Sequence, residues 1–304
     1  MKIYLSKINE SWIVDRVRRE WYANNSDISS KYIYNSDFIW IIAPWLWKKI
    51  PKSQLFKKRV ICSHYHFDFD NFDTRDFFEL DKYVDEYHVI SLKTKEQLKT
   101  LTDKRITSIP FWINQNIFYQ INEKYELREE LGFGHNDFLV GSFQRDTEGS
   151  DLKSPKLIKG PDIFFEKVLE MFNHNKNIKV VLAGKRRNYL IDRLTNANIP
   201  FKYFEMVDSN KLNKLYNILD LYIVSSRIEG GPQAILECAI TKTPILSTDV
   251  GVASEILHKN SLYDERNFSK ATTDTDYAYH NALKYSIPDG MKMFREMFEK
   301  FYEN

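Results

Sequence analysis

Short apolar runs with strand character alternate with helix-like segments along most of this chain. This alternation is typical of parallel sheets whose strands are joined by helices, and it predicts an α/β fold. In the first part of the chain it predicts strands at Lys2–Lys7, Asp37–Ala43, Arg59–Ser63, Glu86–Ser91 and Arg105–Pro110, and helices at Glu10–Ala23, Phe77–Val84 and Thr94–Leu101.

The same alternation begins again near residue 137. The chain has 304 residues, which is enough for two medium-sized domains. We therefore predict a first domain over 1–118, a polar linker over 119–136, a second domain over 137–288 and an amphipathic terminal helix over 289–304. In the second domain, strands are expected at Phe138–Phe143, Asn177–Ala183, Phe201–Phe204, Leu219–Ser225 and Pro244–Ser247, and helices at Pro161–Asn173, Tyr189–Ala197, Ser209–Ile218 and Pro232–Ile240.

Composition excludes several classes of protein. A hydrophobic content of 43% is enough for real cores, so global disorder is excluded. Lys and Arg number 44 against 42 Asp and Glu, and the net charge of +2 carries no strong nucleic-acid signal. Cys62 and Cys238 each lie in an apolar run and are expected to be core thiols of a reducing compartment.

No uncharged apolar run reaches the length of a membrane span, and the first residues do not have the pattern of a signal peptide. A soluble, cytoplasmic protein is therefore expected. The aromatic cluster Pro44–Lys49 leaves two interpretations open. It is a contact with the inner face of a membrane, or its tryptophans pack against the sheet or line a pocket.

Residues 225–251 carry the strongest chemical signal. A predicted strand runs into Glu229, two glycines and Pro232, and an apolar helix carrying Glu237 follows. Proline suits the first helical position, glycines let backbone approach a ligand, and free amides at a helix start attract anions. A nucleotide sugar would find carboxylates for its hydroxyls and amides for its diphosphate. Two glutamates at this spacing also occur by chance, so the surrounding sequence is needed to tell whether the pair marks a nucleotide-sugar site.

That surrounding sequence resembles family 4 of the retaining glycosyltransferases (glycosyl transferases group 1), whose Glu-x7-Glu signature is similar to Glu229–Glu237. Further segments resemble the family in the family's order: 140–146, 159–164, 180–185, 211–226 and 248–257. The resemblance implies the GT-B fold, in which two Rossmann-like domains face each other across a cleft and the C-terminal helix crosses back to the first domain.

The resemblance also implies roles for single residues. Arg145 and Lys159 would hold the donor diphosphate in place of a metal, so neither a metal nor another cofactor is expected. Lys153 or Lys156, in the polar loop 146–158, could replace or supplement Lys159. Glu229 would lie beside the donor sugar. The remaining donor contacts implied by the resemblance are Glu237, Gly230, Gly231, Gln233, Met206 and Val207.

The first domain resembles the family less, and the family's glycine-rich loop is absent after Ile8. His64 is the candidate for an active-site histidine, with His66 as the alternative and a structural or surface role equally open. No third ligand at a convincing spacing supports a metal site at this pair.

The implied activity is retaining transfer of a hexose from a UDP- or GDP-linked donor to a glycan, lipid-linked or other hydroxyl acceptor. A nucleotide-sugar epimerase and a non-catalytic sugar-nucleotide-binding protein remain alternatives.

Overall fold

The computed structural model describes residues 1–7 and 13–303. These residues form two compact units, each of which is described here by itself. Unit 1 contains Met1–Trp112 and Tyr285–Asn304, and unit 2 contains Ile113–Lys284. The predicted start of the first helix, at residues 10–12, lies outside the described residues.

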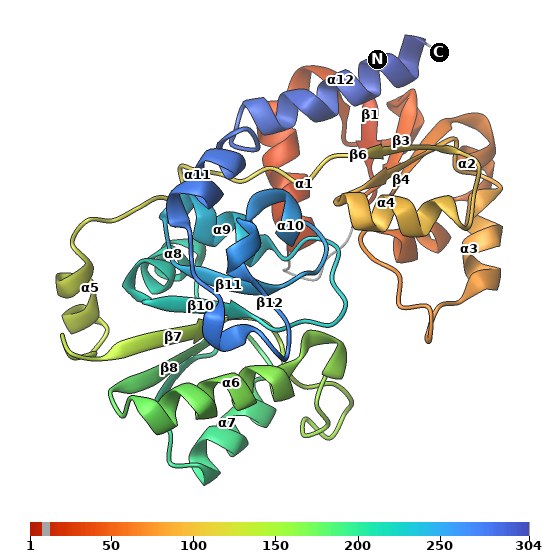
Figure 1. Cartoon of the computed structure of the whole chain (residues 1–304). Helices are drawn as coiled ribbons and strands as arrows, with labels where there is room; N and C mark the ends of the chain where they lie inside the picture. The colour runs from red at the N-terminus through yellow and green to blue at the C-terminus, as the bar shows by residue number, and fades with distance from the viewer. Residues whose placement is uncertain (8–12, 304) are drawn as a thin grey trace. The chain divides into compact units, whose positions relative to one another are not determined.

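Unit 1 is built on a parallel sheet of six described strands in the order β2-β1-β3-β4-β5-β6 (Figure 1). Buried apolar residues such as Ile61 and Val89 make these strands core elements, as the sequence predicts. The strands are β1 (Ile3–Leu5), β2 (Ser29–Ser30), β3 (Phe38–Ile41), β4 (Arg59–His64), β5 (Glu86–Val89) and β6 (Arg105–Ser108).

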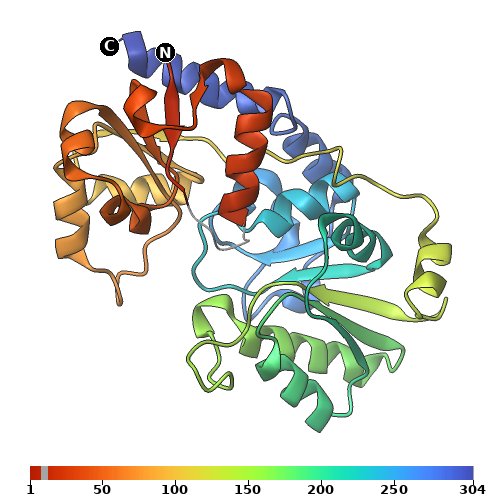
Figure 2. The same cartoon turned by 180° about the vertical axis from the view of Figure 1, so that it is seen from behind.

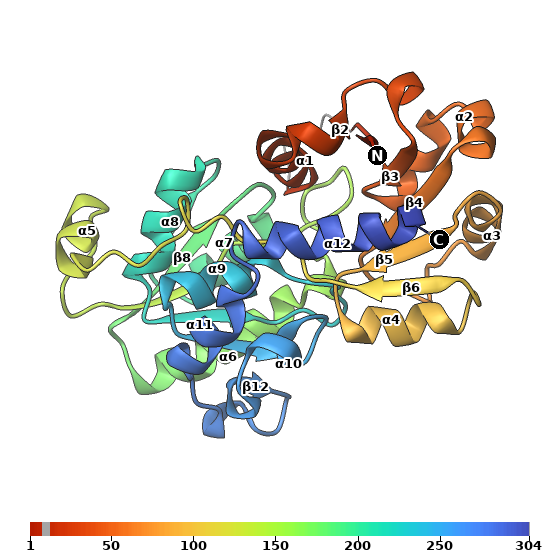
Figure 3. The ribbon, with the colours of Figure 1, turned by 90° about the horizontal axis from the view of Figure 1, so that it is seen from above.

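Helix α12 (Asp289–Glu303) belongs to unit 1, as predicted for the C-terminal helix, and runs along its sheet (Figure 3). Its buried Phe294 and Phe298 pack against Trp21 and Trp40, with ring centroids between 5.2 and 6.5 Å apart. The amphipathic pattern is therefore explained by packing inside unit 1. The other helices of this unit are α1 (Ile13–Asn24), α2 (Lys52–Lys57), α3 (Thr74–Asp81) and α4 (Leu92–Lys99), with short 3₁₀ turns at Ser26–Ile28, Ile33–Asn35 and Pro44–Lys49.

Unit 2 has a second parallel sheet of six described strands, in the order β12-β11-β10-β7-β8-β9. The strands are β7 (Phe138–Ser142), β8 (Ile178–Ala183), β9 (Phe201–Phe204), β10 (Leu221–Val224), β11 (Ile245–Thr248) and β12 (Leu262–Tyr263). Helices α6 and α7 lie on one face of this sheet, and α8, α9 and α11 lie on the other (Figures 1 and 2). The helices are α5 (Lys124–Glu130), α6 (Pro161–His174), α7 (Asn188–Asn196), α8 (Ser209–Ile218), α9 (Gln233–Thr241), α10 (Ala253–Ile256) and α11 (Thr275–Leu283), with 3₁₀ turns at Leu157–Lys159, Lys259–Ser261 and Phe268–Lys270.

Several predicted helices have shifted boundaries; α4, for example, spans Leu92–Lys99 where Thr94–Leu101 was expected. The helix predicted at Phe77–Val84 is α3, which starts three residues earlier because the Asp73 carboxylate caps it by accepting a 3.0 Å hydrogen bond from the Asp76 amide. Pro232 was predicted at the first helical position. It instead precedes α9 as its N-cap residue, with an extended ψ of 115°.

The segment predicted as a linker, 119–136, lies within unit 2 and contains α5. Hydrogen bonds attach it to α8 and the residues after it. The Ile121 amide donates to the side chain of Asn217 at 2.7 Å, and the buried Arg128 donates to the Ile218 carbonyl and the Asp220 carboxylate. A run of polar residues thus became part of the domain because its side chains bond to specific backbone groups.

Three further expectations can be compared with the described residues. Cys62 and Cys238 are both free and buried. In the aromatic cluster, Trp47 is buried and Trp45 is 47% exposed, so the cluster is only partly packed. Within residues 1–7 and 13–303, no helix combines the length and apolar character that crossing a membrane requires.

Candidate functional site

The strand order of the unit 2 sheet reverses between β7 and β10. From β7 the chain continues outward to β8 and β9 on one side, and it returns to β10, β11 and β12 on the other. In open parallel sheets such a switch point leaves a crevice beyond the carboxyl ends of the two strands, where ligands bind. The segments that leave β7 and β10 here are 143–160 and 225–232, which hold Arg145, Lys159 and Glu229.

Close backbone contacts join these two segments. Gly160 has a φ of 60°, and a Cβ at this position would clash with the Ser225 carbonyl oxygen. The amides of Arg227 and Ile228 donate to the Ile158 carbonyl at 2.9 and 3.1 Å. Only glycine allows the loops to approach so closely, and this approach brings Lys159 beside Glu229.

Lys159 and Glu229 form an ion pair between the Lys159 Nζ and the Glu229 Oε1. Their side chains are only 19% and 13% exposed, so water screens the pair incompletely. Gln144 holds the base of the lysine in place, because its Nε2 donates to the Lys159 carbonyl at 2.8 Å. The Ser226 hydroxyl donates to the Gln144 Oε1 at 3.2 Å. Neither Gln144 nor Ser226 was singled out from the sequence, although Gln144 precedes Arg145 and Ser226 lies three residues before Glu229.

More cations than the predicted two gather at this edge. The exposed Arg145 donates from Nε to the Thr147 carbonyl at 2.6 Å. Burial, followed by the charge of Arg186, lowers the pKa of Arg145. Lys156 is half-buried, and burial, Lys159 and Arg145 lower the pKa of its ammonium in that order. The site therefore holds a concentration of positive charge that an anion would relieve.

A buried ion pair anchors the loop that carries these cations. Arg187 is 0% exposed, and its Nε donates to the Asp146 carboxylate at 3.0 Å. Its Nη1 donates to the carbonyls of Ser142 and Ala183, the last residues of β7 and β8, and its Nη2 donates to the Ser142 hydroxyl. The guanidinium thereby connects the ends of two strands to the start of the 146–158 loop. The sequence offers three adjacent cations at 185–187, and nothing in it marked Arg187 as the buried one.

The glycine loop before α9, at Gly230 and Gly231, packs closely against Gly251, which lies after the Glu229–Glu237 segment. Gly251 has a φ of 49°, and a Cβ there would clash with the Gly230 carbonyl. Gly230 is buried, whereas Gly231, Pro232 and Gln233 are half-buried. Because α9 begins at Gln233, the first amides of the helix lie directly after the glycines, at the end where partial positive charge collects.

Glu237 is buried at 4% exposure inside α9. Its Oε2 accepts a 2.7 Å hydrogen bond from the hydroxyl of the buried Tyr216. Burial, with a contribution from Glu237, raises the pKa of Tyr216 above its ordinary value, so the phenol remains a donor. Tyr216 lies on α8 in the predicted helix–strand segment, but no local sequence pattern indicates that it reaches Glu237.

Met206 and Val207 follow β9, the edge strand two places from β7 in the sheet. Met206 is 61% exposed and Val207 is half-buried. Their backbone groups lie in an irregular segment between β9 and α8, on the carboxyl side of the same sheet.

His64 lies in unit 1, as the last residue of β4, and is 5% exposed. Its ring stacks on Phe67 at 5.0 Å and meets the edges of Phe77 and Tyr87. Burial, followed by the charge of His66, lowers the pKa of His64 to about 3. The ring is therefore neutral near pH 7, and its Nε2 has no hydrogen-bond partner among the described residues.

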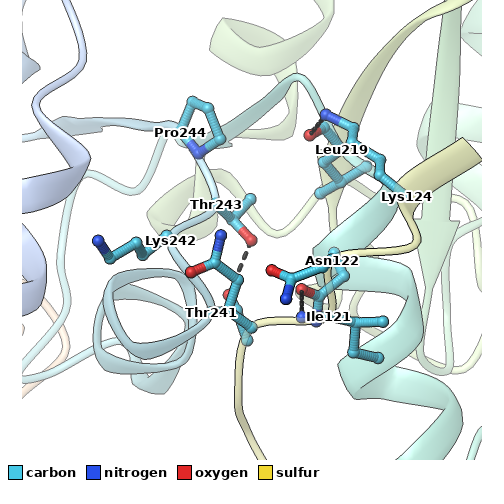
Figure 4. A pocket seen from close by; sticks show the side chains of 10 residues that line it. Ile121, Asn122, Lys124, Leu219, Thr241, Lys242, Thr243 and Pro244 are labelled. Carbon is cyan, nitrogen blue, oxygen red and sulfur yellow. Dashed lines mark hydrogen bonds between the residues drawn. The ribbon is translucent and has the colours of Figure 1, made fainter.

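A cavity of about 210 Å³ also occurs in unit 2, between the segment 120–124 and the turn before β11 (Figure 4). It lies at the amino end of β11, opposite to the strand ends that carry the candidate site. Figure 4 shows Lys124 beside Leu219, and Lys124 also pairs with Asp220 at 3.0 Å. Among the described residues, no three His, Cys, Asp or Glu side chains gather in a way that could hold a metal ion.

The motifs in this region agree with a known family. Residues 157–287 match the family Glycosyl transferases group 1. The lipopolysaccharide core biosynthesis mannosyltransferase LpsB of Rhizobium meliloti (strain 1021) is 24% identical over 142 residues, which cover 44% of this chain and 38% of that protein. The matched family range includes Lys159, Glu229 and Glu237, and it supports the glycosyltransferase family that the sequence resembles.

Solved structures confirm the fold over nearly the whole chain. HepE of Anabaena, in complex with UDP and glucose, is 12% identical with a TM-score of 0.75, covering 99% of this chain and 100% of that one. Sucrose-phosphate synthase of Thermosynechococcus elongatus is 13% identical with a TM-score of 0.69, covering 98% of this chain and 81% of that one. The prediction of an α/β fold of the GT-B type is therefore confirmed.

Proposed function

We propose that this chain is a retaining glycosyltransferase that transfers a hexose from a UDP- or GDP-linked donor to an acceptor hydroxyl. The observation that carries the proposal is the Lys159–Glu229 pair at the switch point of unit 2, with Arg145 and further cations around it. The match of residues 157–287 to Glycosyl transferases group 1, the similarity to a mannosyltransferase and the UDP found in HepE support the same conclusion.

In the proposed reaction, the bond between the anomeric carbon and the phosphate oxygen breaks, and negative charge develops on the departing nucleoside diphosphate. Arg145 and Lys159 offset this charge through charge-assisted hydrogen bonds, so no metal is required for it. Glu229 orients the donor sugar, and Glu237 accepts hydrogen bonds from the ribose hydroxyls. The amides from Gly230 to Gln233 contact the sugar and the phosphate, and Met206 and Val207 present backbone to the base.

The acceptor oxygen bonds to the anomeric carbon on the face from which the phosphate leaves, and its proton passes to that phosphate, so the configuration is retained. His64 enters this proposal only as a neutral imidazole, since burial lowers its pKa to about 3. A general base works best when its pKa lies near the working pH, and the lowered pKa of His64 is far below neutral pH. The proposal includes membership of family 4, with Glu229–Glu237 as its Glu-x7-Glu signature. It also includes catalysis without a metal ion and a location in the cytoplasm, at the inner face of a membrane.

The test is to incubate the chain with a panel of UDP- and GDP-linked sugars and to follow donor hydrolysis and transfer. Arg145→Ala and Glu237→Ala should each lower turnover, the first by about 10²- to 10³-fold because a charge-stabilising donor is lost. Arg193→Ala, which changes an exposed arginine on α7, is the matched control.

Near-normal turnover in both site variants would refute the assignment, and a product of inverted configuration would refute retention. Conversion of the donor without any acceptor would instead indicate an epimerase. Donor binding without turnover would indicate a binding protein.

A further inference from the structure

The cations at the unit 2 site differ in whether they already have a partner. The Lys159 ammonium is paired with the Glu229 carboxylate, and the Arg145 Nε donates to the Thr147 carbonyl. In the part of the chain that the structure describes, the Lys156 ammonium has no hydrogen-bond or ion-pair partner, although the residue is half-buried. A half-buried ammonium without an acceptor is unfavourable, because burial removes water that its three donors would otherwise bind.

The backbone of Lys156 is nevertheless fixed. Its amide donates to the Asp146 carbonyl at 2.8 Å, and its carbonyl accepts from the Lys159 amide at 2.8 Å. An isolated antiparallel bridge between Thr147 and Pro155 closes the loop just before it. Arg187 binds the Asp146 carboxylate, and Asp146 in turn bonds to the Lys156 amide. Lys156 therefore lies in the part of the 146–158 loop that is attached to the sheet.

The tip of the same loop has a different environment. Lys153 is exposed, and its amide donates to the Asp151 side chain at 3.1 Å. Lys156 instead adjoins the candidate site, because its carbonyl accepts from the Lys159 amide at 2.8 Å, and the nearby charges of Lys159 and Arg145 add to the effect of burial in lowering the pKa of its ammonium. The two lysines that the sequence left open as substitutes for Lys159 are thus distinguished by position.

We propose that Lys156 is a diphosphate-binding residue of this chain, in addition to Arg145 and Lys159. This inference rests on the proposed function, since it assumes a nucleoside diphosphate at the site. Lys156 supplies the ammonium that is free to meet the phosphate oxygens. Lys159 must give up part of its contact with the Glu229 carboxylate to meet the same oxygens. The affinity for the nucleotide therefore depends more on Lys156 than on Lys159.

The test is titration calorimetry at fixed ionic strength with UDP and GDP as probes, and with the matching nucleosides uridine and guanosine. Lys156→Gln should weaken binding of the preferred nucleoside diphosphate by about 10- to 100-fold, the range expected when one charge-assisted hydrogen bond is lost. Binding of the nucleoside, which lacks phosphate, should not change. Lys159→Gln should weaken nucleotide binding less than Lys156→Gln, and the matched control Lys153→Gln should bind like the unsubstituted chain.

Each other outcome contradicts a distinct claim. If Lys156→Gln binds the nucleotide normally, or if Lys159→Gln has the larger effect, the inference about Lys156 is wrong while the proposed function stands. An equal loss of nucleoside binding in Lys156→Gln would show a general disturbance of the site and would also contradict a phosphate contact. If the unsubstituted chain binds neither UDP nor GDP, the proposed function itself fails.

Discussion

The two units share one kind of sheet but differ in the chemistry at the carboxyl ends of their strands. In unit 2, charged side chains gather after β7 and β10: Lys159 pairs with Glu229, and Arg145 donates to the Thr147 carbonyl. In unit 1, the corresponding end of β4 is His64, which packs among aromatic rings. Equal topology therefore does not imply equal use of the strand ends. The residues that follow the strands decide which sheet end can bind an anion.

The buried polar groups of the two units differ in the same direction. Unit 2 buries a charged pair, Arg187 with Asp146. Unit 1 buries neutral imidazoles. His88 is 0% exposed, with its Nδ1 2.8 Å from the Ser63 hydroxyl and its Nε2 2.7 Å from the Ile109 carbonyl. We therefore expect different changes to lower the stability of the two units. Unit 2 should be sensitive to loss of a charged partner, and unit 1 should be sensitive to acid.

The largest effect is expected from Arg187→Met in unit 2. The substitution keeps an apolar stem but leaves the Asp146 carboxylate and the strand-end carbonyls of Ser142 and Ala183 without their donor. Removing one member of a buried pair costs about 3–5 kcal/mol. Hydrogen exchange of peptides from β7 and β8 under increasing urea would measure this loss in the free energy of unfolding.

The chain supplies an internal reference for this experiment. All six tryptophans lie at or before Trp112, so tryptophan emission reports unit 1 alone. Emission of the Arg187→Met variant should follow the unsubstituted chain, and the exposed-site control Arg193→Met should change neither signal. A loss below about 1 kcal/mol would show that the pair is energetically equivalent to an exposed one.

How much could be predicted from the sequence depended on where the relevant interaction lies along the chain. Local sequence patterns were enough to predict Lys159, Glu229 and the strands before them. The ion pair between them was not predicted, since it requires Gly160 to lie against Ser225. Arg187 was missed because burial of one cation among three depends on the geometry of two strand ends. The linker was misjudged for a similar reason, since the bonds of Arg128 are made some 90 residues away in sequence.

Acidification should affect unit 1 first. Burial lowers the pKa of His64 to about 3 and that of His88 to about 4, from an ordinary value of 6.5. Below pH 6.5 the unfolded chain therefore binds protons that the folded chain does not. The stability contribution is complete above about pH 6.5 and is lost as pH falls toward 4 and then 3. Each histidine should contribute a loss of up to about 2 kcal/mol between pH 6.5 and 5.

Urea unfolding followed by tryptophan emission at pH 7, 6 and 5 measures this slope. The histidines of unit 2, at 135, 174, 258 and 280, are exposed or half-buried and should add little. His88→Gln should reduce the slope while keeping groups that can bond to Ser63 and to the Ile109 carbonyl. A tryptophan signal with the same midpoint at pH 7 and pH 5 would contradict the neutral buried state of these rings.

The smallest effect comes from a matched pair of tyrosines, one in each unit. Tyr216 donates to the Glu237 carboxylate at 2.7 Å in unit 2, and Tyr87 donates to the Asp81 carboxylate at 2.9 Å in unit 1. Both rings are buried, at 2% and 0% exposure. Tyr216→Phe and Tyr87→Phe remove the same group, and each should cost its own unit about 1 kcal/mol of stability.

The two variants should differ only in nucleotide binding. In the proposed donor site the Tyr216 hydroxyl orients the carboxylate that accepts from the ribose, so Tyr216→Phe should weaken UDP or GDP binding about threefold, within the range of one neutral hydrogen bond. Tyr87→Phe should leave that affinity unchanged, because Asp81 takes no part in the site. Titration calorimetry on both variants separates a positioning role from simple destabilisation. Equal affinity in the two variants would mean that Glu237 does not need its tyrosine to bind the nucleotide.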